Sequence, residues 1–361
     1  MNRIILIGNG FDLAHDLKTS YKNFIDSHWD QKRGQFIKHC EETQGRETYE
    51  DPEIQISNIV RWGTIITNES AENHGYKGFL NYMSMKEWRG KIKFTSAFLE
   101  QITKKQHLQN WVDIEEEYYL ALNECLENSK RDIEKLNSEF LIIQQALEMY
   151  LSEIQKENTK DGYSTSVNID NIIYSELKND EFLRDLKTSE GDIHEILFLS
   201  FNYTTTEKRY PIESKYTDRF GHTYIHIHGE LNNPDNPIVF GYGDEIDEKY
   251  KIIENKNNNL FLQNIKSIKY LETGNLKKLL RFINSDCFQV FIMGHSCGIS
   301  DRTLLNTLFE HDNCQSIKVF FHKKEDGSDN FSDVIRNISR NFNNKAKMRE
   351  RVVPKEYSKS L

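Results

Sequence analysis

Polar side chains with catalytic potential follow directly after apolar segments of the chain. Asn202 comes after residues 195–201, and an asparagine can hold a hydroxyl group or a water molecule through its donor and acceptor atoms. His226 and His228 lie two residues apart in the segment 223–229, which alternates as a strand does, so both would lie on one face of that strand. A histidine before a glycine at a strand end suits a general base, because imidazole titrates near neutral pH. A turn-closing asparagine and a core histidine are the alternative interpretations.

Glycines follow the first apolar segment of the chain, residues 4–7. Gly8 and Gly10 stand where a strand would turn into a helix, and glycines there let the backbone come close to a pyrophosphate group. A tight structural turn would need the same two glycines. The third glycine of the dinucleotide-binding fingerprint is absent, because Leu13 occupies its position. A nucleotide-binding turn and a structural turn therefore both stay open.

A second glycine-rich turn surrounds Ser296. Residues 294–298 match the G-x-S-x-G pattern of the nucleophile elbow in α/β-hydrolases. That fold must still supply an acid and then a histidine from later strands, and the short remainder of the chain offers Asp312 and His322 in a cramped arrangement. A serine esterase that uses Ser296 is nevertheless one function that the pattern allows.

The spacing of histidine, cysteine and acidic residues in the sequence does not indicate a metal site. His222, His226 and His228 lie close in sequence, but no acidic or cysteine ligand falls at a suitable spacing, so we expect no metal. The cysteines are scattered without a C-x-x-C pair, which fits neither a disulfide framework nor a zinc ribbon. This pattern favours a reducing compartment, and we expect the protein in the cytoplasm.

Short apolar segments must place these side chains, and they predict the strands of an α/β core. The expected strands are residues 4–7, 195–201, 223–228, 238–240, 288–293 and 317–321. Strands of this buried kind belong to a mostly parallel sheet flanked by helices, where ligands bind at the carboxyl ends of the strands. We therefore expect a Rossmann-like fold that brings the polar side chains and the glycines to one edge of its sheet.

Helical periodicity fills the long stretch between the first strand and the later ones. We expect a discontinuous α/β domain from residues 1–45 and 190–345, a helical insertion at 46–189 and a C-terminal tail at 346–361. The clearest helix runs from about residue 130 to residue 155. Its apolar residues recur at steps of three and four, at Ile133, Leu136, Phe140, Ile143, Leu147, Tyr150 and Ile154. This seam packs either inside the insertion or against another subunit.

Composition sets the remaining expectations. The 361 residues carry a formal net charge of −9, so no basic field favours nucleic acid or an anionic membrane. No apolar run approaches the length of a membrane span, and the first residues have too short an apolar stretch for a signal peptide. We therefore expect neither a membrane nor a nucleic acid as a partner.

Several motifs in a fixed order resemble those of one protein family. They are I-L-I-G-N-G-F-D-L-A-H at 5–15, T-S-Y at 19–21, W-x-D-x-E at 111–115, S-F-N-Y-T at 200–204, H-I-H-G at 226–229, F-G-Y-G-D at 240–244 and G-H-S-x-G-x-x-D at 294–301. In this order they resemble the AbiH family of bacterial abortive-infection proteins. The same order is distantly similar to sirtuin-like domains, which hydrolyse NAD in bacterial defence proteins.

The resemblance implies a sirtuin-like α/β fold and an anti-phage abortive-infection effector that hydrolyses NAD to nicotinamide and ADP-ribose. It implies that Asn202 positions the nicotinamide ribose or the attacking water, and that His228 acts as the base. It also implies nucleotide contacts at both glycine-rich turns. These residues are Gly8, Gly10 and Asp12 at the phosphates and ribose, Thr19, Ser20 and Tyr21 near the nicotinamide, and Gly294, Ser296 and Asp301 at the adenosine half. Asn9, Phe11 and His295 are further cofactor-binding residues in the same turns.

Two features bear on this resemblance. Asp16-Leu17-Lys18 stands where family members often have Gly-Leu-Pro, in the loop over the nicotinamide pocket. The zinc ribbon of deacylating sirtuins is missing, which favours hydrolysis. The alternative is a non-catalytic sensor that binds NAD or ADP-ribose and signals through the helical insertion. A second copy of the chain, bound through the insertion, and a phage-derived or co-encoded trigger protein are the expected partners.

Overall fold

The computed structural model divides the chain into two compact units. It describes residues 1–44, 47–57, 74–85, 91–105, 111–127, 132–160, 166–183, 192–213, 215 and 219–361. The sheet unit comprises residues 1–19 and 151–361, and the inserted unit comprises residues 20–150. Among the helices described, none is both long and apolar enough to span a membrane.

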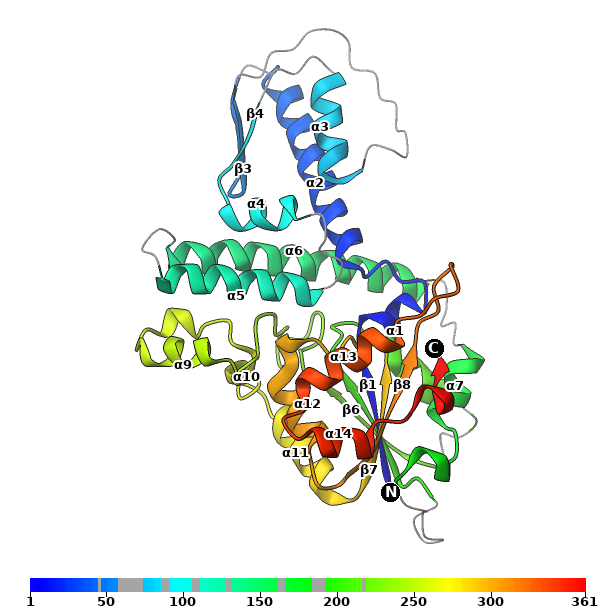
Figure 1. Cartoon of the computed structure of the whole chain (residues 1–361). Coiled ribbons are helices and arrows are strands. Elements are labelled where there is room, and N and C mark those ends of the chain that lie inside the picture. The colour runs from blue at the N-terminus through cyan, green and yellow to red at the C-terminus, as the bar shows by residue number, and fades with distance from the viewer. Residues whose placement is uncertain are drawn as a thin grey trace. The chain divides into compact units, whose positions relative to one another are not determined.

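The sheet unit contains a six-stranded parallel sheet (Figure 1). Its strands are β1 (Asn2–Ile7), β5 (Glu195–Ser200), β6 (Gly221–His226), β7 (Phe288–Met293), β8 (Cys314–Phe321) and β9 (Lys359–Ser360). Their spatial order is β6-β5-β1-β7-β8-β9, and all neighbours pair in parallel. The chain thus builds outward from β1 in one direction and then crosses back to build in the other. This is the strand order of dinucleotide-binding folds, with the switch point between β1 and β7. The expected Rossmann-like fold is confirmed.

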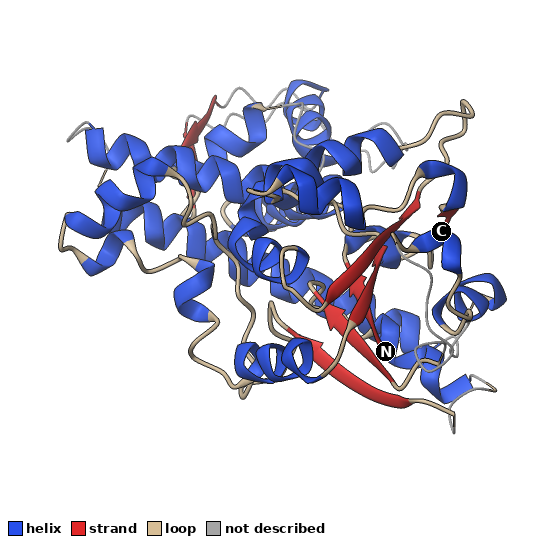
Figure 2. Ribbon diagram, turned by 60° about the horizontal axis from the view of Figure 1, so that its bottom comes forward, coloured by secondary structure: helices blue, strands red, loops and turns tan. Residues whose placement is uncertain are grey.

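Helices pack on both faces of this sheet (Figure 2). The helices of the unit are α1 (Asn9–Leu13), α7 (Val167–Ile173), α8 (Arg209–Glu213), α9 (Glu248–Asn255), α10 (Lys266–Lys269), α11 (Asn275–Ser285), α12 (Arg302–Phe309), α13 (Phe331–Asn341), α14 (Lys345–Arg351) and the 3-10 helices η1 (Asn179–Glu181), η3 (Thr206–Lys208), η4 (Asn259–Phe261), η5 (Ile299–Asp301) and η6 (Lys355–Tyr357). In β1, Ile4 and Leu6 pack with α11, α12 and α13, whereas Ile5 and Ile7 pack with α1, α7 and α8. A strand covered on both faces must be apolar throughout, which explains the run that marks it in the sequence.

The inserted unit combines helices with a small antiparallel sheet. Its described elements are α2 (Tyr21–Glu42), β2 (Tyr49–Glu50), β3 (Ile54–Ser57), α3 (Gly75–Met85), β4 (Lys91–Phe94), α4 (Ala97–Lys104), α5 (Trp111–Glu127) and the first part of α6 (Ile133–Lys160). The expected long helix is α6. Phe140 and Leu147 of its seam have no exposed surface, and the Phe140 ring lies 4.1 Å from that of Tyr118 on α5. This part of the seam therefore packs within the chain.

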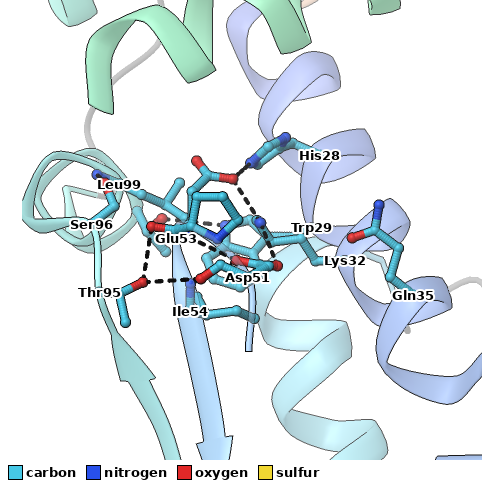
Figure 3. Close-up of polar contacts among 12 residues, drawn as sticks. His28, Trp29, Lys32, Gln35, Asp51, Glu53, Ile54, Thr95, Ser96 and Leu99 are labelled. Carbon is cyan, nitrogen blue, oxygen red and sulfur yellow. Dashed lines mark hydrogen bonds and ion pairs between the residues drawn. The ribbon is translucent and has the colours of Figure 1, made fainter. Parts of the chain in front are cut away.

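A buried charge network ties α2 to the β2–β3 hairpin inside the inserted unit (Figure 3). Lys32 places Nζ 2.9 Å from Asp51 Oδ2 and 2.6 Å from Glu53 Oε2. His28, one turn earlier on α2, places Nε2 3.0 Å from the same Glu53 oxygen. Tyr49 donates its hydroxyl to Asp51 at 2.8 Å. These five side chains are the Lys32 network, and each charged member faces an opposite charge or a hydrogen-bonding group.

The boundaries of the units differ from the expected ones for a reason of packing. Residues 20–45, expected in the α/β domain, lead into the inserted unit, because α2 packs Trp29 and Phe36 against Phe79 of α3. Residues 151–189, expected in the insertion, fall within the range of the sheet unit, because the isoleucines of α7 pack in the same core as Ile5 and Ile7 of β1. Helical periodicity predicts α2 and α7, but it does not tell which core each helix covers.

Two other expectations are corrected. Residues 346–361 are not a tail, because they contain most of α14 and strand β9, which pairs with β8. Residues 238–240 are buried but form no strand. Pro237 precedes them without an N–H group to donate, and the Val239 N–H binds the His228 carbonyl oxygen at 2.7 Å within a loop.

Candidate functional site

The carboxyl ends of four neighbouring strands bring the candidate residues together. Gly8 follows β1, Asn202 follows β5, His228 follows β6 and Gly294 follows β7. These strands run in parallel as the neighbours β6, β5, β1 and β7, so their carboxyl ends form one edge of the sheet. The switch point, where ligands bind in sheets of this kind, lies within this edge.

The glycines at the switch point pack backbone against backbone. The Gly10 N–H donates to the Gly294 carbonyl oxygen at 2.9 Å. A Cβ atom on Gly8 would lie 2.5 Å from His295 Cα, and one on Gly294 would lie 2.1 Å from the Phe11 nitrogen. Gly294 also has φ of +75°, a backbone conformation that favours glycine. The contact between the two turns therefore accounts for these glycines without any ligand.

Asn202 connects the end of β5 to the first turn. Its Nδ2 donates to the Gly8 carbonyl oxygen at 3.0 Å, and its backbone N–H donates to Ser200 Oγ at 3.2 Å. The residue is 7 % exposed. The side chain thus helps to hold the turn that closes β1, so the turn-closing interpretation of Asn202 has direct support.

A first buried cluster lies between α1 and the segment after β5. Thr204 donates its hydroxyl to Asp12 Oδ2 at 2.6 Å, and His226 Nε2 lies 2.8 Å from Glu207 Oε1. These four residues, each at most 4 % exposed, are the Asp12 cluster. Asp12 Oδ1 and Glu207 Oε2 are buried and accept no hydrogen bond from the residues that the structure describes.

Burial and neighbouring charges set the protonation of the Asp12 cluster. Burial raises the pKa of Asp12 to about 6, against the opposing effect of the Thr204 hydrogen bond. Burial alone would lower the pKa of His226, but the Glu207 carboxylate outweighs it and raises that pKa above its ordinary value. His226 therefore serves Glu207 as a counter-charge.

A second buried cluster surrounds Asp301. Its Oδ1 lies 2.8 Å from Lys266 Nζ and 3.1 Å from His228 Nε2, and its Oδ2 lies 3.5 Å from His295 Nε2. The Tyr270 hydroxyl lies 3.0 Å from His228 Nε2. These five residues, each at most 6 % exposed, are the Asp301 cluster. The Asp301 carboxylate is thus in contact with one lysine and two histidines.

The Asp301 cluster keeps His228 uncharged. Burial and then the Lys266 charge lower the pKa of His228 to about 4, although Asp301 acts in the opposite direction. Burial alone would raise the pKa of Asp301, but Lys266 and His228 outweigh it and hold that pKa well below its ordinary value. The carboxylate is therefore ionised and the His228 imidazole is neutral, which is the form that can accept a proton.

Several expected nucleotide contacts have other surroundings. Phe11 is fully buried, and its ring packs against Tyr210 in the core. Thr19 is buried at the end of the first segment of the sheet unit. Ser20 caps α2 by accepting from the Asn23 N–H, and Tyr21 is buried in the same helix of the inserted unit. Asn9 is half-buried at the start of α1.

Ser296 lacks the surroundings of a nucleophile. Its hydroxyl makes no hydrogen bond with a described residue, and its carbonyl oxygen accepts from Asn337 Nδ2 at 2.8 Å. The left-handed backbone of the turn falls on Cys297, with φ of 54°, rather than on the serine. Cys297 is fully buried, and burial raises the pKa of its thiol. His295 is occupied on both ring nitrogens, by the Cys297 N–H at 3.0 Å and by Asp301. The turn thus provides no base for Ser296.

The histidines near β6 also do not converge on a metal. His226 faces Glu207, His228 faces Asp301, and His222 Nε2 lies 3.0 Å from the Tyr174 hydroxyl. Among the described side chains, no group of three or more His, Cys, Asp or Glu residues could hold a metal ion.

Sequence reasoning did not find Lys266, Tyr270 or the role of Glu207. Lys266 lies in a segment of mixed apolar and polar residues without a motif, 35 residues before its partner Asp301. Asp301 does end the G-H-S-x-G-x-x-D motif, and a buried carboxylate requires a positive partner. That requirement signals that a lysine or arginine exists, but it does not say which one.

The family comparison covers both units. A family model described as "Bacteriophage abortive infection AbiH" matches residues 4–323. Comparisons with curated proteins and with solved structures give no match. The matched range contains both glycine-rich turns, Asn202 and all residues of the Asp301 cluster. The chain therefore belongs to the AbiH family of bacteriophage abortive infection proteins.

Proposed function

We propose that this AbiH protein acts in abortive infection by hydrolysing NAD to nicotinamide and ADP-ribose. The supporting observation is that a neutral, buried His228 and Asn202 lie at the carboxyl ends of adjacent strands in a sheet with dinucleotide-binding strand order. In such sheets a dinucleotide lies outside this edge, next to the switch point. The resemblance to sirtuin-like domains names the same two residues.

The reaction makes modest demands on the site. The bond between C1′ of the ribose and the nicotinamide nitrogen breaks, and its electron pair leaves with nicotinamide, which becomes neutral. A water oxygen bonds to the resulting cationic C1′ and releases one proton, giving ADP-ribose. Positioning and a dry environment supply most of the rate, so a strong nucleophile is not needed.

His228 and Asn202 would divide the remaining work. A histidine with a pKa of about 4 is a weak base, which suffices for a water that becomes acidic as it bonds to a cation. The Asn202 amide would orient that water or the ribose through its oxygen, while its nitrogen stays bound to the Gly8 carbonyl. Substrate binding and turn closure can therefore use different atoms of one side chain.

A non-catalytic NAD or ADP-ribose sensor is the second candidate. The observation that favours it is that both proposed catalytic side chains are already engaged within the protein: Asn202 Nδ2 donates to the Gly8 carbonyl oxygen, and His228 Nε2 contacts Asp301. These contacts hold the edge of the sheet in shape without requiring a reaction there. Binding without release of nicotinamide separates the sensor from the hydrolase.

Asn202→Ala and His228→Ala test the proposal in a nicotinamide-release assay followed by chromatography. We expect each variant to lower the rate by about 100-fold or more, the usual contribution of an acid–base group. Asn202→Ala also removes a hydrogen bond worth about 1 kcal/mol, so its melting temperature should fall by a few degrees. His322→Ala is the matched control, because His322 is exposed and directly follows β8. Wild-type rates in both site variants would refute the assignment.

A further inference from the structure

We propose that Lys266 is a positioning residue for the reaction: it balances the charge of Asp301, so that His228 stays a neutral base with its Nε2–H fixed and its Nδ1 free to accept a proton. This inference deepens the proposed hydrolysis and rests on it for the role of the base. The charge relation among the three side chains can be measured whether or not the protein hydrolyses NAD.

The contacts of His228 fix which ring nitrogen carries the hydrogen. Asp301 is ionised and can only accept, so its contact of 3.1 Å with His228 Nε2 requires a hydrogen on that nitrogen. The Tyr270 oxygen, 3.0 Å from the same nitrogen, shares it. A neutral imidazole then carries its lone pair on Nδ1, which makes no hydrogen bond with a described residue. Nδ1 of His228 is therefore the ring nitrogen that can accept a proton.

Lys266 decides whether His228 must also carry a charge. The ammonium group is fully buried and lies 2.8 Å from Asp301 Oδ1, the same oxygen that His228 contacts. One positive and one negative charge therefore cancel inside the cluster. A proton on His228 would add an unbalanced charge among buried groups, which is unfavourable.

The remaining groups around His228 do not replace Lys266. His295 accepts the Cys297 N–H at Nδ1 and directs Nε2 to the other Asp301 oxygen. The rings of Phe201 and Tyr203 lie 4.9 and 6.5 Å from the His228 ring between centroids. Among the described charged groups, Lys266 has the larger effect on the pKa of His228, and His295 acts in the same direction with a smaller one. The lowered pKa of His228, to which Lys266 contributes next after burial, agrees with this.

Lys266→Met is the central variant, and Lys266→Arg is its conservative control. Without the lysine, Asp301 is balanced only if His228 takes up a proton, so we expect the pKa of His228 to rise by about one unit or more. The acid limb of the rate against pH moves to higher pH by the same amount. Lys266→Arg keeps the positive charge and should return the limb to its wild-type position. A purely structural role would change the rate without moving this limb.

Asp301→Asn provides a second variant with a different expected direction. It removes the negative charge that favours protonation of His228, so the acid limb should stay at or below its wild-type position while the rate falls. The pKa of His228 is read independently from the imidazole resonances by nuclear magnetic resonance in the full chain, with His228→Ala to assign the signal.

The outcomes separate this inference from the proposed function. An unshifted His228 resonance and an unshifted acid limb in folded Lys266→Met would overturn the role of Lys266, even if the wild type hydrolyses NAD. A shifted resonance in a protein that releases no nicotinamide would support the charge relation and refute hydrolysis. If Lys266→Met does not fold, an acid limb or resonance that rises in Asp301→Asn overturns the inference.

Discussion

Burial shifts the pKa values of two side chains at the carboxyl edge in opposite directions. Asp12 is 1 % exposed and its pKa is raised to about 6, whereas His228 is 5 % exposed and its pKa is lowered to about 4. Both changes favour the neutral form, as desolvation requires. Near neutral pH the Asp12 carboxylate is therefore ionised against the preference of its surroundings, while His228 is neutral.

Asp12→Asn is expected to make stability less dependent on pH. A carboxyl whose pKa rises from 3.8 to about 6 on folding favours the folded state while it is protonated. That contribution is complete below the unfolded pKa and is lost as the pH rises through about 6, a loss of up to about 3 kcal/mol. Urea unfolding at about pH 4 and about pH 8 measures it. Asp235→Asn, on an exposed loop, should lose as much stability between these two pH values as the wild type does. An equally large loss in Asp12→Asn would contradict the prediction.

Part of the candidate site could be predicted because its residues stand next to strands. Asn202 and His228 each come after an apolar segment, and parallel strands carry such residues to one edge. The partners of His228 could not be predicted in this way, since Lys266 and Asp301 meet it through tertiary packing and no spacing rule connects them. The hydrolysis of NAD by these residues stays a prediction.

At the scale of elements, two turns depend on each other for their shape. The turn after β1 and the turn after β7 touch through Gly8, Gly10 and Gly294, where no side chain fits. Gly8→Ala would place a methyl group 2.5 Å from His295 Cα, so one turn must move. We expect a loss of at least about 2 kcal/mol in the free energy of unfolding.

Gly34→Ala is the control for this steric argument. Gly34 lies inside α2, and a Cβ atom there would meet nothing within 4 Å. Alanine in a helix is favoured over glycine by about 0.5–1 kcal/mol, so this variant should be as stable as the wild type or more so. Chemical unfolding of both variants gives the comparison. Equal stability of Gly8→Ala and the wild type would show that the two turns are not in close contact.

The Lys32 network predicts a large effect from one substitution in the inserted unit. Lys32→Met leaves the buried Glu53 and the half-buried Asp51 without their ammonium partner, and breaking a buried ion pair such as Lys32–Glu53 costs about 3–5 kcal/mol. Lys38→Met is the control on the same helix. Lys38 pairs with Glu42 at 3.9 Å, and both side chains are mostly exposed, so about 0.5 kcal/mol or less is expected. Urea unfolding that shows similar losses for both variants would contradict the network's role.

Individual elements could be predicted better than their allocation to units. Strands β1, β5, β7 and β8 could be predicted because burial on both faces demands continuous apolar runs, whereas the two-residue strand β9 could not. Residues 238–240 have the same composition, but they are a buried loop whose apolar side chains fill the core. Helix α2 buries its aromatic residues in the inserted unit, and a helical pattern carries no information on which core it will cover.

At the scale of the whole molecule, the protein belongs to an abortive-infection family, its large sheet has the strand order of dinucleotide-binding folds, and its chain carries a helical insertion. The family match covers residues 4–323, a range that includes residues of both units. The sequence predicted a parallel sheet, but the order of its strands depends on the crossover between β6 and β7, which no local pattern records. Assembly of copies through the insertion stays a prediction, and the buried part of the α6 seam is not the surface that would mediate it.

The most direct test of the account is the fate of NAD incubated with the purified full chain. Hydrolysis predicts that nicotinamide and ADP-ribose appear in equal amounts as NAD disappears, and that folded His228→Ala releases almost none. Chromatography of the reaction mixture measures all three compounds at once. Wild-type protein that binds NAD and leaves it intact would contradict the central claim and identify the chain as a sensor.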